Sequence, residues 1–166
     1  KYNEKDKRCQ RIKKCLQEQL IRLYNQGVRC FWVGGAMGVD MWAAELLLRM
    51  KEQQAYQDVE LCLALPFEGY NADWDDWHRK RMDFICRYAE KVLVLGEMPS
   101  SESYKKRNYY MVEQAGYMIA VYDNAHNMRS GTQQAVNYAK KKGLQIIYIH
   151  PDTAQVAMED STLWKK

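Results

Sequence analysis

Short apolar segments alternate with helical segments along nearly the whole chain, and this alternation limits the folds open to it. Five runs have the composition of buried strands, at 28–33, 59–65, 91–96, 117–123 and 144–150. Strands separated by helices of about 10–15 residues predict βαβ units, and strands that are apolar on both faces are typical of parallel sheets. The sequence therefore predicts one α/β domain with a doubly wound, mainly parallel sheet and helices on both faces.

Helical periodicity marks the segments between these strands. Helices are expected over 4–26, 39–53, a segment opened by Asp73, Asp75 and Asp76, then 104–115 and 132–142. The helix at 39–53 is apolar nearly all round, which predicts burial against the sheet. The helix after Asp76 is expected to bury an apolar stripe of Trp74, Trp77, Met82, Ile85 and Tyr88. The tail after Pro151 has no clear period.

Composition narrows the class of protein. The 166 residues fit a single domain over 1–166, and no run of about 18 apolar residues suggests a membrane span. The five cysteines form no C-x-x-C pair and are odd in number, which favours reduced thiols and a cytoplasmic protein. His78, His126 and His150 lie far from one another, so no metal site is expected, and no cofactor is expected either.

The formal net charge is +4, and much of it comes from basic residues among the first 22 positions. A solvated helix face explains such a cluster, whereas a nucleic-acid-binding surface normally has a larger basic excess on one face. A small anionic ligand is compatible with either interpretation.

A glycine-rich loop follows the first strand, formed by Gly34, Gly35, Ala36, Met37 and Gly38. Glycine permits positive φ and lets backbone N–H groups come close to a ligand, and the N-terminus of the next helix attracts phosphate or carboxylate. A tight βα turn without a ligand is the alternative. Asp40 beside the loop would repel a bare phosphate, so it is expected either to cap the helix or to bind a sugar hydroxyl or an amine.

Two familiar phosphate-binding motifs do not match this loop. A Walker loop requires Gly-Lys-Ser/Thr, but Gly38 is followed by Val39 and Asp40. The dinucleotide fingerprint requires Gly-x-Gly-x-x-Gly, which the spacing of these glycines does not supply. The acidic residue of that fingerprint does not end the second strand, although Glu68, three residues beyond it, could bind a ribose.

A second candidate loop leaves the fourth strand at Asp123 and enters a helix through Ser130, Gly131 and Thr132. Ser or Thr at this place normally caps the helix, which is the alternative explanation. Ligands of doubly wound sheets bind beyond the carboxyl ends of the strands. Both loops are therefore expected at one rim, where they would hold a ligand with separated anionic or polar groups.

A third candidate segment, 103–116, carries Lys105, Lys106 and Arg107 near a helix start, followed by Asn108. These cations could neutralise a phosphate, and Asn108 could form hydrogen bonds with a polar edge of the ligand. The alternative is that the cluster is solvated surface. The aromatic residues Tyr104, Tyr109 and Tyr110 of this segment, and Trp74 or Trp77 elsewhere, could stack on a base, although at helical spacing they more often belong to a core.

The motifs GGAMGVDMWAAE, LPFEGYNADW, KRNYYMV, AVYD and SGTQQAVNYAKKKG, in this order, resemble the YpsA-like branch of the SLOG superfamily, which shares a fold with DprA and LOG proteins. The resemblance covers roughly residues 2–151. It implies a Rossmann-like sheet with a pocket for a nucleotide or nucleotide derivative. The residues that match the family motifs by position are Gly34, Gly35, Gly38, Asp40, Glu68, Arg107, Asn108, Gly131 and Thr132.

The chain departs from the family in two ways. Family members usually begin with a strand and a loop resembling TGHRP, whereas this sequence starts at Lys1-Tyr2-Asn3, so the first strand of the family is not represented. LOG enzymes carry a Gly-Gly-x-Gly-Thr-x-x-Glu motif, and the glutamate of that motif is absent after Thr132. Glu45 is expected to lie too far along its own helix to replace it.

These observations favour a non-catalytic binding protein, a sensor or a sequestering protein for a nucleotide-derived small molecule. Asp40 and Glu68 are the only carboxylates nominated for acid–base chemistry, and no histidine has an evident nucleophile beside it. Two alternatives stay open: a nucleotide N-glycoside hydrolase related to LOG enzymes, and single-stranded nucleic-acid binding as in DprA. Apolar helix faces are compatible with a homodimer or a higher homo-oligomer, and the host is either a bacterium or a phage.

Overall fold

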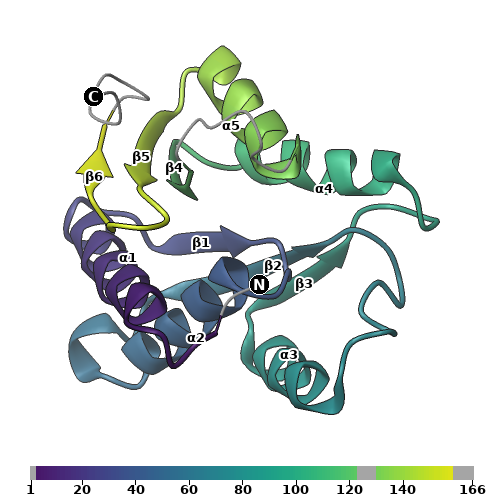
Figure 1. The fold of residues 1–166 in the computed structure, drawn as a ribbon, viewed down its shortest axis with the longest axis horizontal. Helices are drawn as coiled ribbons and strands as arrows, with labels where there is room; N and C mark the ends of the chain where they lie inside the picture. Colours follow the sequence, from purple (N-terminus) through teal and green to yellow (C-terminus); the bar gives the residue numbers. More distant parts are fainter. Residues whose placement is uncertain (1–2, 123–129, 159–166) are drawn as a thin grey trace.

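The computed structural model describes residues 3–122 and 130–158, in which helices and strands alternate as the sequence predicts (Figure 1). The helices are α1 (Lys7–Asn25), α2 (Val39–Lys51), η1 (Gln54–Tyr56), α3 (Asp76–Tyr88), α4 (Ser101–Glu113) and α5 (Ser130–Lys142). The strands are β1 (Cys30–Val33), β2 (Glu60–Leu65), β3 (Lys91–Val94), β4 (Tyr117–Val121), β5 (Gln145–Ile149) and β6 (Val156–Ala157).

Local signals set the helix boundaries. The side chain of Asp6 caps α1 by accepting a hydrogen bond from the backbone N–H of Arg8 at 3.0 Å. Asp75 caps α3 in the same manner, with the N–H of His78 as donor at 3.1 Å. A carboxylate at this position satisfies an N–H group that no helical carbonyl can reach, which is why these acidic residues mark helix starts.

The strands form two three-stranded sheets. β1, β2 and β3 are parallel in that order, with Phe31 opposite Leu61 and Leu63 opposite Val92. In the second sheet β4 and β5 are parallel, and β6 pairs antiparallel with β5. The α/β class and the parallel strands are confirmed. The short strand β6 lies in the tail whose sequence has no period, and the sequence did not predict it.

The two sheets meet at a gap instead of forming one continuous sheet. β1 and β4 each have one edge without a strand partner among the described residues, and both strands line the same cavity. One further parallel strand would join the two halves.

Helices cover both faces of the first sheet. α1, α2 and α3 lie on one face, while α4 packs on the other face beside α5 (Figure 1). Trp42 and Leu47 of α2 are buried in the same core as Leu61 and Leu63 of β2, so the burial predicted for this helix is confirmed. A smaller core between α5 and the second sheet includes Val136, Ala139 and Tyr148.

The apolar stripe expected on α3 is only partly correct. Met82 and Ile85 are buried, and Trp74, which precedes α3, packs against the main core. Trp77 and Tyr88 are 60% and 52% exposed, so the prediction is wrong for these two residues. α3 lies beside the edge strand β3, where only one side of the helix meets the core.

None of the described helices combines the length and the apolar composition that crossing a membrane requires. The five cysteines are all free thiols, and the sulfur atoms of Cys30 and Cys62 lie 3.6 Å apart. Burial, reinforced by the neighbouring Cys30, raises the pKa of the Cys62 thiol to about 12.

Candidate functional site

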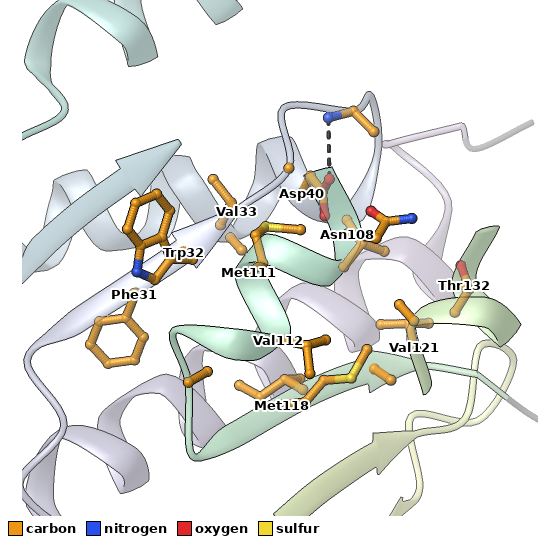
Figure 2. Close-up of a pocket in the computed structure, with 18 of the residues that line it drawn as sticks. Phe31, Trp32, Val33, Asp40, Asn108, Met111, Val112, Met118, Val121 and Thr132 are labelled. Atoms are coloured by element: carbon orange, nitrogen blue, oxygen red, sulfur yellow. Dashed lines mark hydrogen bonds between the residues drawn. The ribbon is translucent and has the colours of Figure 1, made fainter. Parts of the chain in front are cut away.

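A cavity of about 1540 Å³ begins beyond the carboxyl end of β1 and continues between β1 and β4. One end is polar, with Asp40, Asn108 and Thr132 on its walls (Figure 2). The other end is apolar and includes Met111 and Met118. The polar end lies where the topology of an α/β sheet places a ligand, so the candidate site is built from this end.

Gly34 allows α2 and α4 to bring opposite charges to one point. A Cβ atom on Gly34 would lie 2.8 Å from Nη1 of Arg107 and 2.8 Å from Oδ2 of Asp40. Both distances are shorter than real Cβ contacts, so a larger residue would displace one of the two side chains. Glycine is needed here for close approach.

Asp40 lies in the first turn of α2 and holds the glycine loop. Its Oδ2 accepts a hydrogen bond from the backbone N–H of Ala36 at 3.2 Å (Figure 2). The N-cap residue, Gly38, has a φ of 85° and supplies no side-chain cap. Asp40 thus occupies one of the amide groups that an incoming anion would otherwise use, which fits the expectation that this loop would not take a bare phosphate.

Arg107 of α4 is only 7% exposed, so the solvated interpretation of the basic cluster is wrong for this residue. Its Nη1 donates hydrogen bonds to the backbone carbonyls of Gly34 and Ala64, the latter at 3.4 Å, and its Nε donates to Oδ1 of Asn108 at 2.7 Å. Burial lowers the pKa of Arg107, while the charge of Asp40 raises it. Within the described part of the chain the guanidinium makes no ion pair of 4 Å or less.

The neighbours of Arg107 on α4 differ in position. Lys106 is exposed, whereas Lys105 lines the cavity and its Nζ lies 5.5 Å from the ring centroid of Tyr109. Asn108 also lines the cavity, where its Oδ1 accepts the hydrogen bond from Nε of Arg107. The predicted cluster therefore divides into two cations that line the cavity, the buried Arg107 and the half-buried Lys105, and one exposed cation, Lys106.

The second predicted loop reaches the same cavity from α5. Gly131 and Thr132, in the first turn of α5, line the cavity together with Gly34, Ala36 and Met37. The first turn of α5 and the glycine loop therefore line one cavity, whereas residues 123–129 of the second motif lie outside the described residues. Since the first turn of a helix carries unpaired N–H groups, α5 adds partial positive charge to the polar end.

Other residues nominated from the sequence lie elsewhere. Gly35 has a φ of 79°, and its carbonyl accepts a hydrogen bond from the hydroxyl of Tyr70 at 2.7 Å, so it shapes the loop from outside the cavity. Glu68 is exposed and does not line the cavity. Asp123 lies outside the described residues, and Ser130 begins α5.

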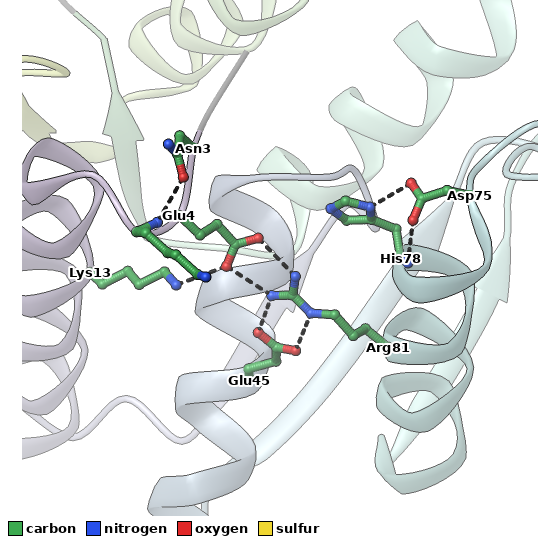
Figure 3. Close-up of polar contacts among 8 residues, drawn as sticks. Asn3, Glu4, Lys13, Glu45, Asp75, His78 and Arg81 are labelled. Carbon is green, nitrogen blue, oxygen red and sulfur yellow. Dashed lines mark hydrogen bonds and ion pairs between the residues drawn. The ribbon is translucent and has the colours of Figure 1, made fainter.

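Glu45 faces away from the site. Both of its carboxylate oxygens accept hydrogen bonds from Arg81 of α3, at 2.9 and 2.7 Å (Figure 3). Arg81 also pairs with Glu4, which Lys13 contacts at 2.9 Å. Glu45 is thus engaged in a structural ion-pair network, in keeping with the expectation that it does not replace the missing glutamate of LOG enzymes.

Sequence reasoning missed a second, smaller pocket beside the glycine loop. It has a volume of about 190 Å³ and is lined by Ala36, Met37, Tyr70, Trp74, Tyr104 and Arg107. We call it the aromatic niche. Trp74 and Tyr104 were named from the sequence as stacking candidates, but Tyr70 gave no local signal, since only the fold brings it to Gly35.

A search of the described residues finds no group of three or more His, Cys, Asp or Glu side chains placed to hold a metal ion.

Comparison with known proteins agrees with the motifs. The family model described as the YspA SLOG family matches residues 1–154. UPF0398 proteins from two strains of Bacillus cereus, ATCC 14579 and B4264, are each 31% identical to the chain over 134 residues, which is 80% of this chain and 71% of each relative. A UPF0398 protein from Bacillus thuringiensis (strain Al Hakam) is 30% identical over the same length. With a matched family model over nearly its whole length, the chain belongs to the YspA SLOG family.

Proposed function

We propose that the polar end of the cavity binds a nucleotide or a nucleotide-derived small molecule, and that the protein acts as a sensor or a sequestering protein without transforming the ligand. The observation that carries this proposal is the environment of Arg107. The guanidinium is buried, and its hydrogen-bond partners within the described residues are neutral oxygen atoms, so no carboxylate is bonded to it there. Such a group is suited to a ligand phosphate.

Two helix starts support the same ligand chemistry. α2 begins behind the glycine loop, and α5 begins at Gly131 and Thr132 across the cavity. Helix N-termini favour anions, and the hydroxyl of Thr132 can donate a hydrogen bond to a phosphate. Asp40 opposes a second phosphate close to Ala36, because its carboxylate already holds that amide. A sugar hydroxyl is the better partner for Asp40.

Family membership agrees with this assignment, since the SLOG family is associated with nucleotide-derived ligands. The proposal of a non-catalytic role depends on which carboxylates of this chain lie at the cavity. In the described part, the carboxylates that line the cavity are Asp40 and Glu102, while Glu45 is engaged by Arg81. Glu102 is exposed in the first turn of α4, and the carboxylate of Asp40 already holds a backbone amide, so neither is well placed for general acid–base chemistry.

Isothermal titration calorimetry with ADP-ribose, NAD and cyclic nucleotides tests the proposal. We expect saturable binding of at least one of these compounds by the wild-type protein. Thr132→Val, which removes a hydroxyl from the cavity wall, should weaken that binding by roughly 5- to 10-fold while the thermal unfolding temperature stays unchanged. Asn108→Ala should also weaken binding, but it removes the acceptor of the buried Arg107 Nε–H and should therefore lower the unfolding temperature as well. Lys106→Gln, an exposed change on the same helix as Asn108, is the matched control and should leave binding unchanged.

The absence of heat change with every compound, together with unaltered behaviour of Thr132→Val and Asn108→Ala in cells, would contradict the proposal. Gly38→Glu is a stronger perturbation, because a side chain at a φ of 85° is strained and the added charge repels an anion. Its folding should be checked first by circular dichroism.

A further inference from the structure

We propose that the aromatic niche binds the planar base of the nucleotide, while Arg107 and the polar end of the cavity bind its phosphate. This inference rests on the proposed function and adds a second subsite to it. The observation behind it is a ring-sized pocket with aromatic walls that shares Ala36, Met37, Tyr104 and Arg107 with the larger cavity, whereas Tyr70 and Trp74 line the niche alone.

The walls of the niche come from three separate parts of the chain. Tyr70 and Trp74 follow β2, and their ring centroids lie 5.6 Å apart at an interplanar angle of 81°. Tyr104 belongs to α4 and contacts Phe67 edge-to-face, with centroids 5.7 Å apart. Met37, from the glycine loop, supplies a thioether. Aromatic rings and a polarisable sulfur atom form a surface that favours a flat π system.

These side chains are held in place before any ligand arrives. The hydroxyl of Tyr70 donates to the carbonyl of Gly35 at 2.7 Å, and burial raises the pKa of this phenol, so the hydroxyl stays protonated and the bond persists. Trp74 packs against the main core. A rigid wall lowers the entropy cost of stacking, which increases the affinity available to a ligand.

Arg107 connects the niche to the phosphate subsite. Its guanidinium carbon lies 5.6 Å from the ring centroid of Tyr104, and Arg107 lines both the niche and the larger cavity. A guanidinium can stack on a base with its plane and donate hydrogen bonds to a phosphate with its edge. One nucleotide can therefore contact Arg107 from both pockets.

The size of the niche restricts the occupant. A volume of about 190 Å³ corresponds to roughly six water molecules, well below the range of about 300–1,000 Å³ typical of pockets that enclose a whole ligand. The niche accommodates a ring system and leaves the sugar and phosphate outside. Because its walls provide mainly stacking surface, we expect bases of different identity to bind with similar affinity.

Calorimetric titration of AMP and of ribose 5-phosphate separates the two subsites, because ribose 5-phosphate has the sugar and phosphate without the base. We expect AMP to bind on the order of 10- to 100-fold more tightly than ribose 5-phosphate, the range that stacking on aromatic side chains supplies. Tyr104→Leu, at a residue that is 41% exposed and therefore tolerant of change, should bring the affinity for AMP close to that for ribose 5-phosphate. Because Tyr104 also lines the larger cavity, its loss should weaken ribose 5-phosphate binding much less than it weakens AMP binding.

Trp74→Leu should have the same effect, and AMP, but not ribose 5-phosphate, should quench the fluorescence that Trp74→Leu removes. Trp77→Leu is the matched control: Trp77 is exposed on α3 and lies outside the niche, so both affinities should stay at the wild-type values.

The possible failures are distinguishable. If ribose 5-phosphate and AMP bind equally tightly, or if Tyr104→Leu weakens both by the same factor, the base subsite is wrong and the proposed function stands. If neither compound binds, and ADP-ribose and NAD also give no heat, the proposed function fails and the base subsite fails with it.

Discussion

The guanidinium of Arg107 in α4 donates a hydrogen bond to the backbone carbonyl of Gly34, which lies 73 positions earlier in the chain. This bond fixes the loop after β1 against α4, on the face of the sheet opposite α2. The positive charge of the site and the conformation of the glycine loop therefore depend on each other. A change on either side of the bond should alter both stability and ligand binding.

Gly34→Ala should perturb the site from the loop side. The new methyl group would lie 2.8 Å from atoms of Arg107 and Asp40, so at least one side chain must move. Overpacking of this kind destabilises a protein by about 1–3 kcal/mol, and we expect nucleotide binding to be lost as well. Urea denaturation and calorimetry provide the two measurements. Gly116→Ala is the control, because a Cβ there meets nothing within 4 Å; equal behaviour of the two variants would show that the crowding at Gly34 is unimportant.

The ion pairs of Glu4 should give the protein a pH-dependent stability. Burial alone raises the pKa of Glu4, but hydrogen bonds and charges from Arg81 and Lys13 outweigh it and lower the pKa from 4.5 to about 2 (Figure 3). Because the pKa of Glu4 is lower in the folded state, its ionised carboxylate stabilises the fold at pH values above 4.5. This contribution, up to about 3 kcal/mol, is lost as the pH falls toward 2.

Glu4→Gln should therefore be less stable than wild type at pH 7 and should lose less of its stability between pH 5 and pH 2.5. Arg81 keeps its bonds to Glu45 in this variant, so the fold should survive. Thermal unfolding across this pH range measures the difference, with the exposed Glu52→Gln as control. If the stabilities of wild type and Glu4→Gln change with pH by the same amount, Glu4 is not the source of this pH dependence.

Chemistry on the ligand is the first alternative to simple binding. Wild-type protein incubated with AMP, NAD or ADP-ribose should release no free base, since Asp40 is bonded to the N–H of Ala36 and Glu45 to Arg81. Chromatography of the reaction mixture is the measurement. Release of a base that disappears in Asp40→Asn would instead identify the protein as a nucleotide N-glycoside hydrolase.

Nucleic-acid binding is the second alternative, and the structure weakens its electrostatic basis. Arg107 is buried, Lys13 pairs with Glu4, and Arg8 pairs with Asp152 at 3.2 Å. We expect labelled single-stranded DNA to show no saturable binding in fluorescence anisotropy at 200 mM salt. Tight binding that falls steeply with salt and is reduced by Lys105→Gln would favour a DprA-like role.

Oligomeric state stays a prediction of the sequence. The exposed aromatic residues of α3, Trp77, Phe84 and Tyr88, agree with the expectation of apolar helix faces.

The sequence by itself determined the order of the elements and the places where the loops meet. Alternating apolar runs and helical periods are local properties, so β1, α2 and β2 lie within a few residues of their predicted ranges. Asp75 caps α3 because capping needs only the next few residues. Parallel strands then bring their carboxyl ends to one edge, and this is why the loops around Gly34 and Gly131 could be predicted to share a rim.

Tertiary structure alone decided which side chains are buried and what they contact. Arg107 sits in a basic run that is typical of surface, yet it is buried because the carbonyls of Gly34 and Ala64 from other elements receive its hydrogen bonds. Trp77 has the helical spacing of a core residue, yet it is exposed because α3 lies at the sheet edge. The burial of a side chain depends on elements distant in sequence, and a local pattern contains no information about them.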